Sequence, residues 1–80
     1  MEKSIFSAGH ARLLRVLRQV REKAGLTQIQ LAKKLGKPQS FVSKYETGER
    51  RLDLLELREV CRAVGVTLAE FVRRFERARG

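Results

Sequence analysis

Residues 27–48 read TQIQLAKKLGKPQSFVSKYETG, and no other stretch of the chain is as informative. They predict two short helices joined by a tight turn at Gly36. Thr27 and Gln30 have the spacing of a capping box, in which each side chain accepts from the other residue's free backbone N–H. Pro38 fits the first turn of the second helix, over about 38–46, because its missing N–H costs nothing there. Two helices joined in this way are the construction that places one helix in the major groove of DNA.

The sequence before this stretch also has the helical period. Over residues 8–24, apolar side chains recur at spacings of three and four, through Leu17, Val20 and Ala24. This spacing predicts a helix with one buried face. Gly25 suits the left-handed position that ends such a helix.

Two more helices are predicted after it. Capping signatures at Asp53 with Glu56 and at Thr67 with Glu70 precede apolar periods over about 54–64 and 68–79. The side chains expected on the inner face of the first are Leu54, Leu57, Val60, Cys61 and Val64, and the apolar side chains of the second are Leu68, Phe71, Val72 and Phe75. No window has the alternation and turn signals of a strand pair. We therefore predict an all-α fold of five helices in a single domain over residues 1–80.

The charge balance indicates a polyanionic partner. Lys and Arg total 18 against 9 Asp and Glu, which leaves a net charge of +9. Nucleic acid is the first candidate and an anionic membrane surface the second. No apolar run approaches the roughly 18 residues that a membrane span needs, and the N-terminus lacks the apolar core of a signal peptide. We expect a protein of the reducing cytoplasm, associated with the nucleoid through DNA.

Catalytic and metal chemistry have little support. Cys61 is the single cysteine and His10 the single histidine, so neither an internal disulfide nor a metal-ligand set is indicated. Cys61 is expected to be a small buried side chain and His10 a surface residue. The glycines fit helix ends and not a phosphate-binding loop. We predict no enzymatic activity, no cofactor, no metal and no small-molecule ligand.

Several short motifs stand at a spacing that is specific to one family. They are Gly25-Leu26-Thr27-Gln28, Leu31-Ala32, Leu35-Gly36 and Glu46-Thr47-Gly48. With them, residues 13–75 resemble the phage-repressor and Cro class of helix-turn-helix regulators, the Xre-like family. The resemblance implies a sequence-specific transcriptional regulator of double-stranded DNA without an effector domain. Its recognition helix, the one over 38–46, would lie in the major groove.

The resemblance places four side chains on the groove-facing side of the recognition helix, namely Gln39, Ser40, Phe41 and Lys44. Their chemistry agrees, since glutamine pairs with adenine N6 and N7 and lysine reaches guanine O6 or N7. Phe41 departs from the family, in which this position is usually small or polar. Two alternatives stay open for its ring: an apolar contact to a base or sugar, and packing against the protein's own surface.

Contacts to the DNA backbone, which set register without reading sequence, are implied for Gln28, Lys37, Ser43, Thr47, Arg50 and Arg51. For Arg50 and Arg51 the alternative is a pair of solvated surface arginines. The resemblance also implies a partly buried ion pair between Arg21 and Glu46. Such a pair would fix the angle of the recognition helix.

One domain of this size contacts about half an operator, so we expect a homodimer on an inverted repeat with half-sites about 34 Å apart. The helix over 68–79 would provide the contact. The candidate interface residues are Val72, Phe75 and Leu55, with Ile5 and Phe6 as further candidates.

Two other functions share this sequence pattern. A DNA-binding antitoxin or a restriction-system controller would use the same chemistry and differ only in its partner. A helical protein–protein adaptor would not read DNA, and the presence together of Gln28, Gln39 and Lys44 argues against it.

Overall fold

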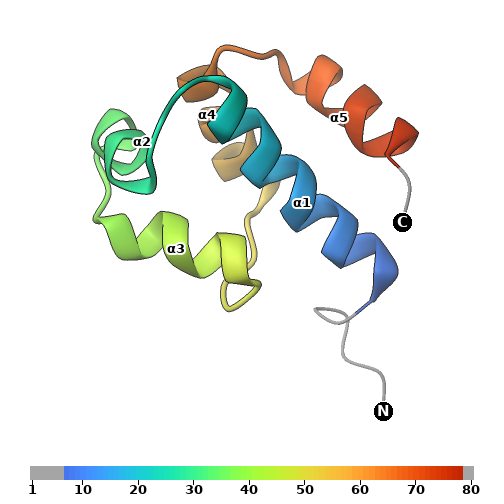
Figure 1. Cartoon of the computed structure of the whole chain (residues 1–80), viewed down its shortest axis with the longest axis horizontal. Helices are drawn as coiled ribbons and strands as arrows, with labels where there is room; N and C mark the ends of the chain where they lie inside the picture. Colours follow the sequence, from blue (N-terminus) through green and yellow to red (C-terminus); the bar gives the residue numbers. More distant parts are fainter. Residues whose placement is uncertain (1–6, 79–80) are drawn as a thin grey trace.

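The computed structural model describes residues 7–78, which contain five α-helices and no strand (Figure 1). The helices are α1 (Ala8–Lys23), α2 (Gln28–Leu35), α3 (Gln39–Thr47), α4 (Leu54–Val64) and α5 (Leu68–Arg77). The predicted all-α fold is confirmed, with each helix within about two residues of its expected bounds. The turn between α2 and α3 contains Gly36 in the left-handed conformation, with φ of 67°, which allows the tight change of direction.

Two predicted capping boxes are complete. Thr27 Oγ1 accepts from the Gln30 backbone N–H at 3.1 Å, and the Gln30 side chain accepts from the Thr27 N–H at 2.9 Å. Asp53 and Glu56 form the same reciprocal pair at 2.8 and 3.0 Å. The starts of α2 and α4 are therefore fixed by their own sequence.

Two other helix starts differ from the prediction. At α5, Thr67 accepts from the Glu70 backbone N–H, but the Glu70 carboxylate lies 3.7 Å from Arg74 and does not complete a capping box with Thr67. At α3, Pro38 is extended, with φ of −70° and ψ of 157°, and precedes the helix, which begins at Gln39. A proline in the extended conformation serves as the residue before the first turn, so the helix starts one residue later.

The core contains apolar side chains from every helix. Its buried members are Val16, Leu17, Val20, Leu31, Ala32, Val42, Tyr45, Val60, Cys61, Val64 and Phe71. Cys61 is buried as expected, and desolvation raises the pKa of its thiol to about 11. At neutral pH the thiol is therefore uncharged and packs as a small apolar group.

Three side chains are placed differently from the sequence-based expectation. Ala24 is exposed because α1 has already ended at Lys23. Leu54 is 65% exposed and is the first residue of α4, at the end of the helix that extends beyond the core. His10 is buried, with 8% exposure, because the chain passes close to it after α3: a Cβ at Gly48 would lie 3.8 Å from His10 Nε2.

The packing of the helices leaves one side of α3 uncovered. α3 packs against α2 and α1, whereas α4 packs against α2 and α5, and α5 also lies along α1 (Figure 1). Within residues 7–78, no helix has the length and apolar content needed to cross a membrane.

Candidate nucleic-acid interface

α3 divides its side chains between the core and the surface. Val42 and Tyr45 are buried, whereas Gln39, Ser40 and Lys44 are exposed. Because one helical turn takes 3.6 residues, the three exposed side chains share the face that points away from the core. The structure thus brings three of the four side chains expected to contact bases together on one surface.

A chain of side-chain hydrogen bonds leads from this face to the interior. Gln39 Nε2 donates to Gln28 Oε1 at 2.9 Å, and Gln28 Nε2 donates to Glu46 Oε1 at 3.0 Å. Glu46 also accepts from Arg21, whose Nε lies 2.7 Å from Oε2 and whose Nη2 lies 3.0 Å from Oε1. The exposed amide of Gln39 is therefore connected, through Gln28, to a charged pair beneath it.

The Arg21–Glu46 pair lies between α1 and the last turn of α3, where the resemblance places it. The two side chains are 11% and 0% exposed. Arg21 Nη1 also donates to the Leu26 carbonyl at 2.8 Å, and Arg18 Nε lies 3.8 Å from the carboxylate. The hydrogen bonds to Glu46 raise the pKa of Arg21 above its ordinary value. Both charges have the partners that buried ions require.

Phe41 is half-buried on the side of α3 that faces α4. Its ring meets Tyr45 edge to face, with centroids 5.6 Å apart and an interplanar angle of 77°. Lys37 Nζ lies 5.5 Å from the ring centroid and the Arg50 guanidinium carbon 4.8 Å from it, within the range of cation–π attraction. The ring thus packs on the protein's own surface, which is one of the two alternatives named for it.

The residues expected to contact the DNA backbone have different surroundings. Lys37 is exposed in the turn before α3, and Ser43 is half-buried. Thr47 is exposed at the end of α3, where its Oγ1 donates to the Lys44 carbonyl at 3.1 Å. Gln28 has one amide N–H bound to Glu46, which leaves its second N–H as a donor.

Arg50 and Arg51 follow α3 in the loop that leads to α4. Arg50 forms a bidentate ion pair with Glu56, with Nη1 to Oε1 at 3.1 Å and Nη2 to Oε2 at 2.8 Å. This pair, together with the Asp53 backbone N–H, lowers the pKa of Glu56 to about 2. Burial and, secondly, the charge of Arg51 lower the pKa of His10 below 6.5.

Sequence reasoning assigned Glu56 only a capping role and missed its pairing with Arg50. The capping box can be read from local spacing, because its two residues lie on one helical turn. The ion pair depends on how the loop after α3 returns across α4. No sequence spacing indicates that path.

The residues expected at a dimer interface remain partly uncovered. Val72 on α5 is 44% exposed and Leu55 on α4 is 65% exposed. Phe75 is half-buried, with the Arg12 guanidinium 5.4 Å from its ring centroid. Ile5 and Phe6, which were named as further candidates, lie outside the described residues.

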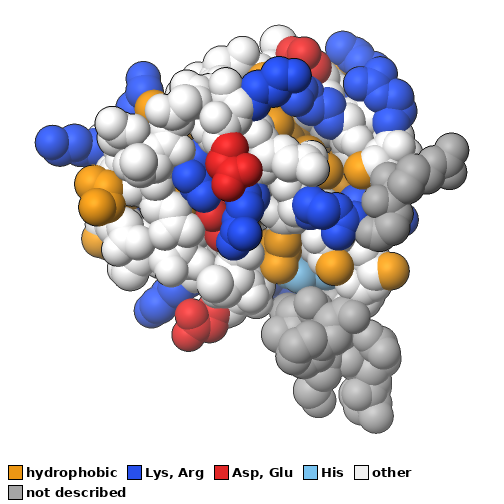
Figure 2. All heavy atoms as spheres, in the orientation of Figure 1, with side chains coloured by type: hydrophobic (Ala, Val, Ile, Leu, Met, Phe, Trp, Pro, Cys, Tyr) orange, Lys and Arg blue, Asp and Glu red, His pale blue; other side chains and the backbone are white. Residues whose placement is uncertain are grey.

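Positive charge is distributed widely over the molecule. Figure 2 shows Lys and Arg side chains over α1 and α5 and at other points of this face, in no single band. A net charge of +9 attracts a polyanion over long range.

Comparison with known proteins identifies the family. The helix-turn-helix family model matches residues 17–71. The chain is similar to the solved XRE-family like protein from Pseudomonas syringae pv. tomato str. DC3000. The identity is 44%, 91% of this chain and 89% of that chain are covered, and the TM-score is 0.82.

The fold is also that of the clp gene regulator ClgR from C. glutamicum. The identity is 24%, 88% of this chain and 90% of that chain are covered, and the TM-score is 0.77. A comparison with curated proteins finds no match. The chain belongs to the Xre-like helix-turn-helix family of DNA-binding transcriptional regulators.

Proposed function

We propose that the protein regulates transcription by binding a specific double-stranded sequence, with α3 in the major groove and Gln39, Ser40 and Lys44 reading base edges. The observation that carries this proposal is the hydrogen-bonded chain from Gln39 through Gln28 to Glu46. It holds a side chain on the exposed face of α3 in one orientation. A reading group that is ordered before binding loses less conformational entropy on binding.

The bonding of Gln39 suits adenine. A glutamine amide has two N–H donors and one acceptor oxygen. One N–H of Gln39 is used by Gln28 Oε1. The other N–H and Oε1 remain, and these are the donor and acceptor that pair with adenine N7 and N6.

Lys44 and Ser40 complete the reading surface. Lys44 reaches guanine O6 or N7, and the Ser40 hydroxyl serves as donor or acceptor. Phe41 contributes to this surface only through the part of its ring that Lys37 and Arg50 leave open, which suits a sugar or a thymine methyl group.

Backbone contacts place α3 in the groove. Gln28 donates its second amide N–H to a phosphate, and Lys37, Ser43, Thr47 and Arg51 supply further contacts. Thr47 must release the Lys44 carbonyl to donate its hydroxyl proton, so its contribution is expected to be the weakest. Neutralisation of about six phosphates by Lys and Arg side chains predicts a slope near −5 for log K against log salt concentration, at about −0.9 per phosphate.

We further propose that the protein binds as a homodimer to an inverted repeat. Leu55 and Val72 are exposed apolar side chains, and Leu54 adds a third, also 65% exposed. With Phe75 they provide the apolar contact between protomers. A two-fold dimer then presents two copies of α3 to half-sites about 34 Å apart.

Base reading and backbone contact can be separated by substitution. Gln39→Ala and Lys44→Ala are each expected to lose preference at one base pair of the half-site, worth about 1–3 kcal/mol. Lys37→Ala is the matched control, since it weakens binding to all sequences equally and lowers the salt slope by about 1. If all three variants lost the same affinity for every DNA sequence, base reading by α3 would be contradicted.

The oligomeric state is tested by sedimentation at micromolar concentration with an inverted-repeat duplex. The wild-type chain, of 9.2 kDa, is expected to bind as two copies, and Val72→Glu as one. Wild-type protein that stays at one copy per duplex would contradict the dimer and leave base reading by α3 in place.

A further inference from the structure

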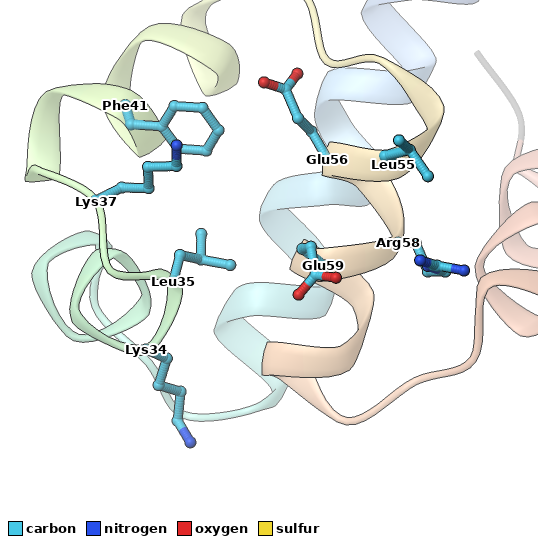
Figure 3. A pocket seen from close by; sticks show the side chains of 8 residues that line it. All are labelled: Lys34, Leu35, Lys37, Phe41, Leu55, Glu56, Arg58 and Glu59. Carbon is cyan, nitrogen blue, oxygen red and sulfur yellow. The ribbon is translucent and has the colours of Figure 1, made fainter.

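A groove runs between α3 and α4, with the end of α2 as part of its lining. The groove has a volume of about 360 Å³. Figure 3 shows Lys37 and Phe41 on one wall and Leu55, Glu56 and Glu59 on the other. The shared core and α2 hold α3 and α4 together, and contacts at the edge of the groove can add to this by fixing the first turn of α4 beside the recognition helix.

Arg50 makes such a contact. Its guanidinium lies 4.8 Å from the centroid of the Phe41 ring. Nη1 donates to Glu56 Oε1 at 3.1 Å and to the Arg51 carbonyl at 3.0 Å, and Nη2 donates to Glu56 Oε2 at 2.8 Å. The Arg50 backbone N–H donates to the Lys44 carbonyl at 3.2 Å. One arginine thus contacts the side of α3, its own loop and α4.

The far end of this contact is the start of α4. Glu56 Oε1 accepts from the Asp53 backbone N–H at 3.0 Å, and Asp53 Oδ1 accepts from the Glu56 N–H at 2.8 Å. The same carboxylate that caps α4 therefore binds Arg50. The link runs from the Phe41 ring through Arg50 to the first turn of α4.

We propose that Phe41, Arg50 and Glu56 are positioning residues for DNA binding. They hold the loop after α3 and the first turn of α4 at a fixed place beside the recognition helix, so that the neighbouring Lys37 and Arg51 meet the DNA backbone in register. Arg50 acts through Glu56 and is not itself a phosphate ligand. This inference rests on the proposed function, since it assigns how the same DNA surface is held.

The competing assignment, Arg50 as a phosphate ligand, predicts the opposite sign for one substitution. Glu56→Gln removes a negative charge beside DNA and releases Arg50. If Arg50 binds phosphate, this variant binds DNA more tightly and has a steeper salt slope. If Arg50 is a positioning residue, the variant binds more weakly, although it carries one more net positive charge.

The experiment measures duplex affinity of the full chain against salt concentration for wild type, Glu56→Gln and Glu59→Gln. Glu59 is the matched control because it lies on the same helix and forms, at 3.5 Å, an ion pair with the exposed Arg62. We expect Glu56→Gln to bind up to about fivefold more weakly, with the salt slope unchanged. Glu59→Gln is expected to bind equally well or slightly more tightly.

Phe41 provides a second, independent readout. Phe41→Tyr keeps the aromatic face for Arg50 and is expected to retain affinity, whereas Phe41→Leu is expected to weaken binding as Glu56→Gln does. Because the two residues act through one arginine, the double variant is expected to be no weaker than either single one. Circular dichroism melting of each variant verifies that the chain is folded at the binding temperature.

The outcomes separate this inference from the proposed function. Tighter binding by Glu56→Gln, or additive losses in the double variant, would overturn the positioning role while wild-type binding remained. Wild-type binding that shows no preference for any duplex sequence would instead overturn the proposed function itself.

Discussion

Two arginine–carboxylate pairs flank the recognition helix, and they differ mainly in burial. Arg21–Glu46 ties α3 to α1 with side chains 11% and 0% exposed. Arg50–Glu56 ties the loop after α3 to α4 with side chains 41% and 27% exposed. Both have two hydrogen bonds of 2.7 to 3.1 Å.

Bond geometry alone does not determine what an ion pair contributes to the protein. Removing one partner of a buried pair leaves a charge without solvent, which is costly. Removing one partner of an exposed pair leaves a charge that water can solvate. We therefore expect the first pair to contribute much to stability, and the second to contribute little to stability and to hold the shape of the DNA-binding surface.

The largest expected effect comes from breaking the buried pair. Arg21→Ala is expected to lower the free energy of unfolding by about 3–5 kcal/mol, measured by urea denaturation. Arg62→Ala, which removes an exposed arginine paired at 3.5 Å with Glu59, is the control and should have little effect. Equal, small losses of unfolding free energy in both variants would mean that burial does not make the Arg21–Glu46 pair more important than an exposed pair.

A smaller effect of opposite sign is expected beside the buried pair. Tyr45 is 1% exposed, and its hydroxyl has no hydrogen-bond partner within residues 7–78. Tyr45→Phe removes this desolvated group and should raise the free energy of unfolding by about 1 kcal/mol. The measurement is the urea midpoint, and a clear decrease would show that the hydroxyl is satisfied in solution.

The exposed pair should be visible in the acid range. Its carboxylate, Glu56, has a pKa lowered from 4.5 to about 2, so the stability it contributes is complete above about pH 5 and is lost as the pH falls toward 2. The difference in unfolding free energy between wild type and Glu56→Gln should shrink over that range. A difference that stays constant down to pH 2 would be evidence against the ion pair in solution.

The smallest expected effect concerns His10, which is buried like Arg21 but has no bonded partner for Nε2 in the described part of the chain. Its pKa lies below 6.5 in the folded state. The folded protein then binds fewer protons than the unfolded chain, so stability falls as the pH drops below 6.5. The melting temperature of the wild type, measured between about pH 5.5 and 7.5, should fall as the pH drops. This dependence should be absent in His10→Leu.

The helices were predictable because their signals are local. Thr27 with Gln30 and Asp53 with Glu56 lie on single helical turns, so their spacing alone indicates where α2 and α4 begin. Thr67 and Glu70 have the same spacing, but the Glu70 side chain forms no hydrogen bond to the Thr67 backbone N–H. It lies near Arg74 instead. Pro38 likewise fits either of two adjacent positions, and only the backbone conformation distinguishes them.

The candidate site was predictable only in part. The helical period separates Gln39, Ser40 and Lys44 from Val42 and Tyr45 without reference to the rest of the fold. The burial of His10 depends on where the chain passes after α3. The packing of the Phe41 ring depends on Arg50, which lies in that same segment. Such contacts are set by tertiary structure, which a helical period does not describe.

α3 is proposed to read a DNA sequence, and selection from random duplex DNA at about 150 mM salt tests this claim most directly. Enrichment of an inverted repeat with half-sites about one helical turn apart is the predicted result. Binding that enriches no sequence and disappears as the salt concentration rises would contradict the claim. It would leave a basic helical domain with only non-specific attraction to DNA.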